Sequence, residues 1–84
     1  MNESDLIQHI DLLHTTQLGK IRVLRNLSLG EIDVVQWCVE KIQSEHAKIV
    51  RKGKNWYITI DGCIITVNAH SYTIITAHKK RMSE

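Results

Sequence analysis

Hydrophobic residues recur at helical spacing through the first half of the chain. The spacing predicts a first helix that begins with a polar cap at residues 2–5 and ends near His14. Two threonines follow and offer the N-cap of a second helix, which closes at Leu27. Its other apolar positions are Leu18, Ile21 and Leu24. After a break at residues 28–30, a third helix is expected, with apolar positions at Ile32, Val34, Val35, Trp37, Cys38 and Ile42.

From Ala47 onward the pattern changes from helical spacing to alternation, and β-branched residues dominate, as strands require. Four strands are expected, at residues 48–52, 55–60, 63–68 and 72–78. The dipeptide Asp61-Gly62 is a strong signal for a two-residue hairpin turn. The sequence therefore predicts an α+β fold, in which three N-terminal helices pack on one face of a four-stranded antiparallel meander sheet.

The hairpin turn predicts which side chains of the sheet share a face. A two-residue turn places Ile60 opposite Cys63, and the alternation continues from there along both strands. The face expected to meet the core holds Trp56, Ile58, Ile60, Cys63, Ile65 and Val67, joined by Thr73, Ile75 and Ala77 if the loop at 69–71 has three residues. The opposite face then holds Tyr57, Thr59, Ile64, Thr66, Asn68, Tyr72, Ile74, Thr76 and His78. A slip of one residue in that loop would exchange the two faces of the last strand.

The 84 residues suffice for one domain with a single core, formed by a helical part at residues 1–46 and an antiparallel sheet at residues 47–80. The opening residues carry early acids and no apolar run long enough for a signal peptide, so we expect a cytoplasmic protein. Cys38 and Cys63 are far apart and have no Cys-x-x-Cys partner, which predicts free thiols and gives no support to a metal site. We expect no cofactor and no membrane partner.

The charges are divided unevenly between the two halves of the chain. Residues 1–46 hold four Lys or Arg against seven acids, whereas residues 47–84 hold seven against two. The positive side chains of the second half form two clusters, which are Lys48, Arg51, Lys52 and Lys54 near the first two strands and Lys79, Lys80 and Arg81 after the last. A basic patch that flanks a sheet favours a phosphate-bearing partner, although ordinary solvated strand ends have the same composition.

The face opposite the core gathers tyrosines, hydroxyl groups, an asparagine and a histidine. Flat aromatic rings stack on bases, and hydroxyl and amide groups form hydrogen bonds with nucleotide edges. The side chains expected to bind a substrate are Tyr57, Tyr72, Thr66, Asn68, Thr76, Thr15, Thr16, Ser71 and His70. Thr15 and Thr16 belong to this set because the free N–H groups of a helix N-terminus attract anions. The alternative is an ordinary exposed sheet face, with capping and turn roles for the hydroxyl groups.

Several segments of the chain resemble a group of short uncharacterised bacterial and phage proteins. They are Leu13-His14-Thr15-Thr16, Leu18-Gly19, Gly53-Lys54-Asn55-Trp56-Tyr57 and the segment from Ile65 to Tyr72. This resemblance covers nearly the whole chain and brings no known activity with it. The order of elements, helices followed by a meander that ends in Ser71-Tyr72-Thr73-Ile74-Ile75-Thr76-Ala77-His78-Lys79, also resembles the barnase, colicin and RelE-type ribonuclease superfamily.

The ribonuclease resemblance implies metal-independent cleavage of RNA, in which the ribose 2′-hydroxyl attacks the adjacent phosphorus. Such a toxin-like endoribonuclease needs a base, an acid and positive charge. His78 is the first candidate for proton transfer, and His14, beside a helix N-terminus, is the second. Arg22 would stabilise the negative charge of the transition state. Arg51 would do the same if a three-residue loop after the first strand places it on the polar face.

A second hypothesis is a non-catalytic binding or inhibitory module of phage or mobile-element origin. Such a module would grip a protein or a nucleotide with the same polar face of the sheet, without turnover. Its partner would be RNA, a nucleotide, a host protein or an antitoxin protein. An exposed sheet edge would also permit a homodimer.

Overall fold

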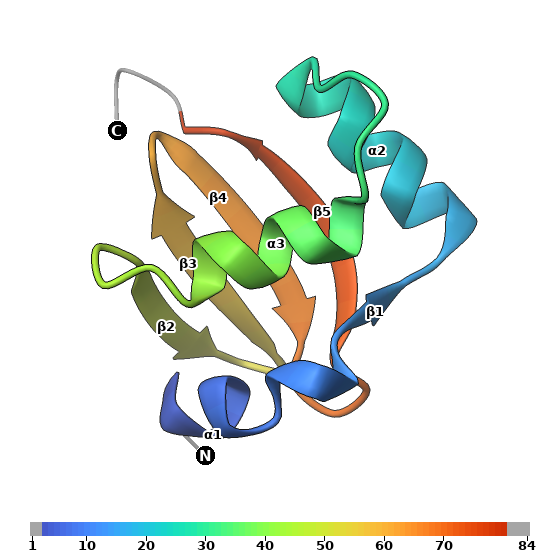
Figure 1. The fold of residues 1–84 in the computed structure, drawn as a ribbon. Coiled ribbons are helices and arrows are strands. Elements are labelled where there is room, and N and C mark those ends of the chain that lie inside the picture. Colours follow the sequence, from blue (N-terminus) through green and yellow to red (C-terminus); the bar gives the residue numbers. More distant parts are fainter. Residues whose placement is uncertain (1–2, 81–84) are drawn as a thin grey trace.

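In the computed structural model, which describes residues 3–80, helices lie against a single sheet (Figure 1). The elements in chain order are α1 (Glu3–Gln8), the 3-10 helix η1 (Ile10–Leu12), β1 (His14–Thr15), α2 (Gln17–Leu27), α3 (Val34–Ile42), β2 (Lys48–Lys52), β3 (Asn55–Ile60), β4 (Cys63–Asn68) and β5 (Thr73–Lys79). The strand order is β1-β5-β4-β3-β2. Part of the cap predicted at residues 2–5 lies outside the described residues. Arg81 of the second basic cluster also lies outside them.

Within residues 3–80 the sheet has five strands and is mixed, so the prediction of a four-stranded antiparallel meander is wrong. His14 and Thr15 form the additional strand β1, which pairs in parallel with Thr73 and Ile74 of β5. Both α2 and α3 follow β1, so the prediction of three helices ahead of the whole sheet is wrong as well. A strand of two residues is too short to show alternation in a sequence, and this segment has the composition of a boundary between helices.

The four strands expected in the second half are confirmed as β2 to β5, within one residue at each end. Asp61 and Gly62 have φ values of 51° and 74°, the positive values that a two-residue type I′ turn needs. Their turn places Ile60 opposite Cys63, as predicted, and the pairing continues without a shift to the other end of β3. The predicted faces of β3 and β4 are therefore confirmed.

α3 crosses the centre of one face of the sheet (Figure 1). Asp33 caps this helix, because its carboxylate accepts a hydrogen bond of 3.1 Å from the backbone N–H of the third helical residue. Val34, Cys38 and Ile42 follow one another at successive turns and are buried in the same core as the apolar residues of β3 and β4. Leu6 of α1 is also fully buried in this core. The helical layer thus covers one face of the sheet.

α2 lies along β5 (Figure 1), and the side that it buries differs in part from the predicted one. Thr16 caps the helix as expected, because its hydroxyl accepts a hydrogen bond of 3.0 Å from Gly19 N. The buried residues of the helix are Gly19, Val23 and Leu27. Leu18 and Ile21, predicted to be apolar contacts, are 56% and 40% exposed. Gly19 has no Cβ, so the helix can approach the backbone of β5 closely, and this contact decides which side is buried.

The register of β5 changes once along its length. Val67 lies opposite Ile74, whereas the preceding residue of β4 lies opposite Thr76, so Ile75 is the extra residue of a β-bulge. Ile74 is fully buried in the core, although the sequence pattern places it on the other face. The prediction that Thr73 faces the core is wrong for the same reason. A bulge changes the face of every residue on one side of it, and simple alternation cannot show where it occurs.

Candidate functional site

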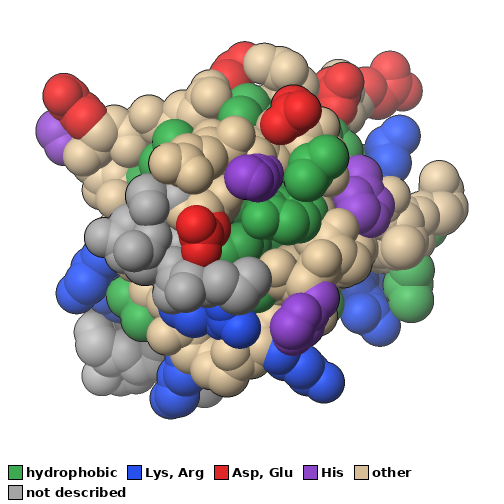
Figure 2. Space-filling model, turned by 90° about the horizontal axis from the view of Figure 1, so that it is seen from below, with side chains coloured by type: hydrophobic (Ala, Val, Ile, Leu, Met, Phe, Trp, Pro, Cys, Tyr) green, Lys and Arg blue, Asp and Glu red, His purple; other side chains and the backbone are tan. Residues whose placement is uncertain are grey.

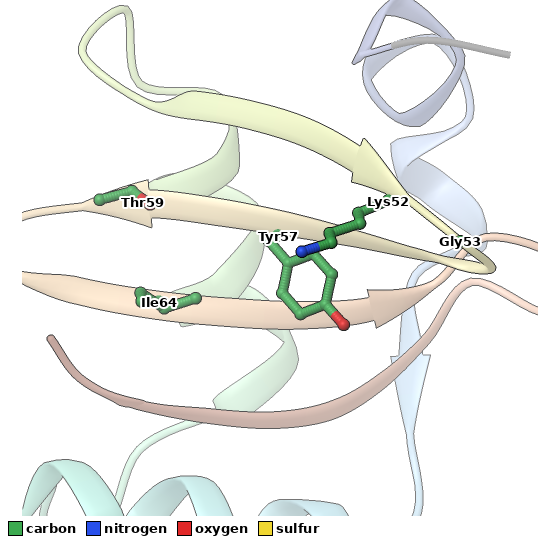
Figure 3. A pocket seen from close by; sticks show the side chains of 5 residues that line it. All are labelled: Lys52, Gly53, Tyr57, Thr59 and Ile64. Atoms are coloured by element: carbon green, nitrogen blue, oxygen red, sulfur yellow. The ribbon is translucent and has the colours of Figure 1, made fainter. Parts of the chain in front are cut away.

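The face of the sheet that points away from the helical layer is called the open face here. Side chains alternate between the two faces of a strand, so paired residues on neighbouring strands share a face. The open face consists of Lys48, Val50 and Lys52 of β2, Asn55, Tyr57 and Thr59 of β3, Ile64, Thr66 and Asn68 of β4, and Thr76 and His78 of β5. Figure 3 shows part of this face, with α3 behind the sheet.

A depression of about 490 Å³ lies on the open face, lined by Lys52, Gly53, Tyr57, Thr59 and Ile64 (Figure 3). Tyr57 supplies a flat aromatic ring and Ile64 an aliphatic wall. The side chain of Lys52 extends across β3 toward the Tyr57 ring (Figure 3). The Tyr57 hydroxyl accepts a long hydrogen bond of 3.4 Å from Asn55 Nδ2. One ligand in this depression would therefore meet a ring, a hydroxyl group and an ammonium group.

Charged side chains on the open face are cationic, and none of its described side chains is a carboxylate. Lys48 and Lys52 stand on β2 at one edge of the sheet. Asp61, in the turn between β3 and β4, binds Lys41 of α3 at 2.6 Å. This hydrogen bond raises the pKa of the Lys41 ammonium group. An anionic ligand on the open face would therefore meet cations without an opposing carboxylate.

α2 borders the open face along β5. Asn26 Nδ2 donates a hydrogen bond of 3.2 Å to the Thr76 hydroxyl, so the side of α2 that carries Asn26 adjoins this face. Arg22 precedes Asn26 by one helical turn, is exposed and belongs to the same side of the helix. The open face thus has the two lysines of β2 along one border and Arg22 along the other.

The predicted site residues that lie on the open face are Tyr57, Thr66, Asn68, Thr76 and His78. Thr66 is only 7% exposed, because it stands between Tyr57 and Thr76 on the neighbouring strands. The carboxamide of Asn68 serves the fold, since its Oδ1 accepts hydrogen bonds from His70 N at 2.9 Å and Ser71 N at 3.0 Å. Tyr57, Thr76 and His78 have more of their side chains open to a ligand.

Arg51 and Tyr72 lie on the helix side of the sheet, contrary to prediction. The turn between β2 and β3 has two residues rather than three, so Arg51 pairs with Trp56 and its guanidinium lies 5.9 Å from the centre of the Trp56 ring. Tyr72 has a left-handed φ of 60° and packs on Trp56, with ring centroids 5.4 Å apart. The ring of His9 stacks on Tyr72 at 6.0 Å. The structure therefore separates Arg51 and Tyr72 from the side chains of the open face.

His14 is held at the edge of the sheet through both of its ring nitrogens. Nδ1 lies 2.9 Å from the Leu12 carbonyl oxygen, which can only accept, so Nδ1 carries a proton. Nε2 lies 3.0 Å from the Thr73 hydroxyl, and that hydroxyl lies 2.7 Å from the hydroxyl of Ser71. This arrangement orients the imidazole and places a hydroxyl group where it can exchange a proton with Nε2.

The other predicted residues near His14 stabilise the fold or lie in a loop. The Thr15 hydroxyl donates a hydrogen bond of 2.9 Å to the Ile74 carbonyl, and the Thr16 hydroxyl caps α2. His70 is exposed in the loop between β4 and β5. Figure 2 views the end of the molecule that carries α1 and this loop, where several histidine side chains surround exposed hydrophobic ones. These histidines belong to the end of the molecule rather than to the open face.

His14 and His78 are far apart on the sheet. His14 lies opposite Thr73, and His78 stands five residues beyond Thr73 on β5. At about 3.3 Å per residue, roughly 16 Å of strand separate the two positions. A general base and a general acid that serve one scissile bond must both lie within hydrogen-bond reach of the reacting groups. The structure therefore does not bring the predicted pair of histidines together.

The predicted site omits Lys52, Thr59 and Ile64, which line the depression beside Tyr57. Alternation alone can find them. Continuing it backward from the Asp61-Gly62 turn through a two-residue turn at 53–54 places Lys52 on the same face as Tyr57. The signal was the two-residue spacing between β2 and β3, which the sequence shows as clearly as the spacing between β3 and β4.

Two classes of feature are absent from the described part of the chain. No group of three or more His, Cys, Asp or Glu side chains within residues 3–80 is arranged to hold a metal ion. No helix within the same residues is long and apolar enough to cross a membrane.

A family model described as "Protein of unknown function (DUF3781)" matches residues 7–78, which include every strand position of the open face. No curated protein and no solved structure matches the chain. The expectation of an uncharacterised family is confirmed by this match. Because the match covers most of its length, the chain belongs to this family of proteins of unknown function.

Proposed function

We propose that this protein is a small module that binds single-stranded nucleic acid across the open face of its sheet. One observation carries the proposal. A sheet face that no described helix covers presents a half-buried tyrosine ring, hydroxyl groups and two lysines, and its described side chains include no carboxylate. A cytoplasmic location would give such a module access to RNA.

The chemistry of the open face suits a ligand that has both flat rings and phosphates. Stacking of a base on an aromatic side chain contributes about 1–3 kcal/mol and tolerates any base. Lys48 and Lys52 on one border and Arg22 on the other can neutralise phosphates that cross the sheet. A single strand fits better than a duplex, because a duplex hides the faces of its bases and offers only groove edges.

The separation of the candidate proton-transfer groups favours binding over cleavage. A ribonuclease of the kind implied by the resemblance needs a base and an acid on either side of one phosphate. The positions of His14 and His78 are roughly 16 Å apart along β5, and Arg51 lies on the opposite side of the sheet from His78. A binding module needs none of these groups to meet.

Fluorescence anisotropy tests the proposal with fluorescein-labelled single-stranded RNA of about 12 nucleotides, a length within the range that small nucleic-acid-binding domains cover. We expect binding at low salt that weakens linearly in a plot of log K against log salt concentration. Single-stranded DNA and double-stranded RNA of the same length serve as comparisons, and the duplex should bind more weakly. Absence of binding of any single strand at low salt would overturn the proposal.

A pair of matched variants locates the binding surface. Combining Lys48→Gln with Lys52→Gln should lower the salt slope by about 1.4, since each phosphate contact with a single strand contributes about 0.7. Combining Lys20→Gln with Lys41→Gln removes the same charge from the helical layer, on α2 and α3, and should leave most of the slope in place. An equal loss in the two double variants would mean that net charge, rather than the open face, drives binding.

The ribonuclease hypothesis predicts a different result with the same RNA. Total RNA incubated with the protein in excess EDTA should remain intact if the protein only binds. New cleavage ends that disappear in His14→Ala or His78→Ala would instead assign the open face or its edge a catalytic function.

A further inference from the structure

We infer that the depression beside Tyr57 is the binding site for one nucleotide, with the base stacked on the Tyr57 ring and an adjoining phosphate bound by Lys52. This inference rests on the proposed function and gives it a location within the open face. The remaining open-face side chains would then contact neighbouring nucleotides less strongly.

The composition of the depression matches one nucleotide rather than an apolar side chain. Its lining joins the Tyr57 ring and the Ile64 side chain, which offer flat and aliphatic surfaces, to the hydroxyl of Thr59. The ammonium group of Lys52 reaches toward the Tyr57 ring from the border of the same depression (Figure 3). A sugar separates the base and the phosphate of one nucleotide. The Tyr57 ring and the Lys52 ammonium group therefore need to lie near each other but do not need to touch.

Tyr57 is oriented before any ligand arrives. Its hydroxyl is bound by the Asn55 carboxamide at 3.4 Å, and the strand pairing places it between Val50 and Thr66. A side chain that is already oriented loses less conformational entropy when a ligand stacks on it. Asn55 is in this sense a positioning residue, which acts on the ligand through Tyr57.

The border of the depression leaves room for a sugar-phosphate backbone. Gly53 belongs to the lining and has a positive φ of 62°, which glycine adopts without strain. A Cβ at this position would meet no atom within 4 Å, so the space above the turn is open. A phosphate can therefore approach Lys52 from the β2–β3 turn without displacing protein atoms.

Three substitutions separate the stacking from the phosphate contact, with the same labelled single-stranded RNA as the probe. Tyr57→Ala should weaken binding by about 5- to 150-fold, the range that corresponds to one base stack, and should leave the salt slope unchanged. Tyr57→Phe keeps the ring and should bind within about threefold of the wild type. Lys52→Gln should lower the salt slope by about 0.7. Leu18→Ala, at a position 56% exposed on α2, is the control and should change neither quantity.

Photocrosslinking gives a second measurement that does not depend on a truncated variant. Single-stranded RNA that carries 5-iodouridine should crosslink to the peptide that contains Tyr57, as read by mass spectrometry. Two results would overturn the inference while leaving the proposed function intact. One is that the wild type binds and Tyr57→Ala binds with the same affinity. The other is that the RNA crosslinks only to other aromatic residues, such as Trp37. Failure of the wild type to bind any single strand would overturn both.

Discussion

The imidazole of His14 and the hydroxyl of Thr73 face each other across the parallel pairing of β1 and β5, with Nε2 3.0 Å from Oγ1. β1 contributes only two residues to the sheet, so side-chain contacts of this kind supplement a short ladder of backbone hydrogen bonds. The Thr73 hydroxyl also lies 2.7 Å from that of Ser71, which connects β1 to the loop ahead of β5. The contact thus joins the first strand to the last.

Replacing Thr73 with valine should destabilise the protein by about 1 kcal/mol, because it removes a hydrogen bond and leaves a ring nitrogen of His14 without its partner. The side chain keeps its shape, so packing changes little. For a domain of this size the loss corresponds to a fall of about 4–8 °C in Tm, measured by circular dichroism. Thr59→Val on β3 is the control and should stay within about 0.5 kcal/mol of the wild type. Equal losses in both variants would contradict the role given to the contact.

Replacing Gly19 with alanine should destabilise the protein, although alanine is normally the better residue inside a helix by about 1 kcal/mol. A Cβ at this position would lie 2.9 Å from the Ile74 carbonyl oxygen and against the Thr15 hydroxyl, so α2 would have to move away from β5. Overpacking of this kind costs about 1–3 kcal/mol. Urea unfolding measures the difference.

Gly30→Ala is the matched control for Gly19→Ala. A Cβ at Gly30 would meet no atom within 4 Å, so this variant should be neutral or slightly more stable than the wild type. A Gly19→Ala protein as stable as Gly30→Ala would show that α2 is not held at the distance described.

The loop between β4 and β5 depends on one acceptor atom. Asn68 Oδ1 accepts hydrogen bonds from His70 N, Ser71 N and Ser71 Oγ at 2.9, 3.0 and 3.2 Å. Asn68→Ala should therefore cost about 1–3 kcal/mol in the free energy of unfolding. Asn68→Asp keeps an oxygen in the same place and should retain most of the stability. If the two variants lose the same amount in urea, the acceptor is not what orders the loop.

The two cysteines should differ sharply in reactivity. Cys38 is buried, and burial raises the pKa of its thiol to about 12, whereas Cys63 is half-buried. Since the thiolate is the nucleophile, Ellman's reagent at pH 8 should label Cys63 in the folded protein and Cys38 only after unfolding. Similar rates for both thiols in the folded protein would contradict this assignment.

The same burial predicts a loss of stability in alkali. A thiol in the unfolded chain ionises near pH 8.5, while Cys38 in the folded protein resists ionisation until about pH 12. The contribution of the Cys38 thiol to the free energy of unfolding is complete below about pH 8.5. It declines as the pH rises toward 12, because in this range only the unfolded state releases the proton. Cys38→Ala should show a shallower decline than Cys63→Ala when Tm is followed from pH 8 to 11.

The sequence predicts the antiparallel part of the fold well, because strong local signals determine it. Asp61-Gly62 specifies a tight turn, and the alternation on both sides of it places Trp56 and Val67 in the core and Tyr57 on the open face. The lysines of β2 follow the same pattern once the turn at 53–54 has two residues, although Arg51 was the residue expected on this face. This part of the site follows from the two-residue periodicity of strands.

The remaining features depend on contacts between distant residues, which a sequence pattern does not show. β1 forms because His14 and Thr15 pair with β5, which is distant in the sequence. The bulge at Ile75 allows Ile74 to be buried in the core. The side of α2 that is buried depends on the close approach of Gly19 to β5 rather than on where leucines recur. Tyr72 lies on the helix side because its φ is left-handed and its ring packs on Trp56.

The two edges of the sheet have different consequences for aggregation. At one edge, β1 covers two residues of β5 and α2 lies alongside the rest, whereas β2 at the other edge pairs with β3 alone among the described strands. Fibre growth by strand addition needs two receptive edges in each molecule. A molecule with one receptive edge can add only one other copy, because after two copies join through β2 neither of them has a second receptive edge for a third. Even when the lysines of β2 are neutralised, assembly through this sheet should therefore stop at two copies.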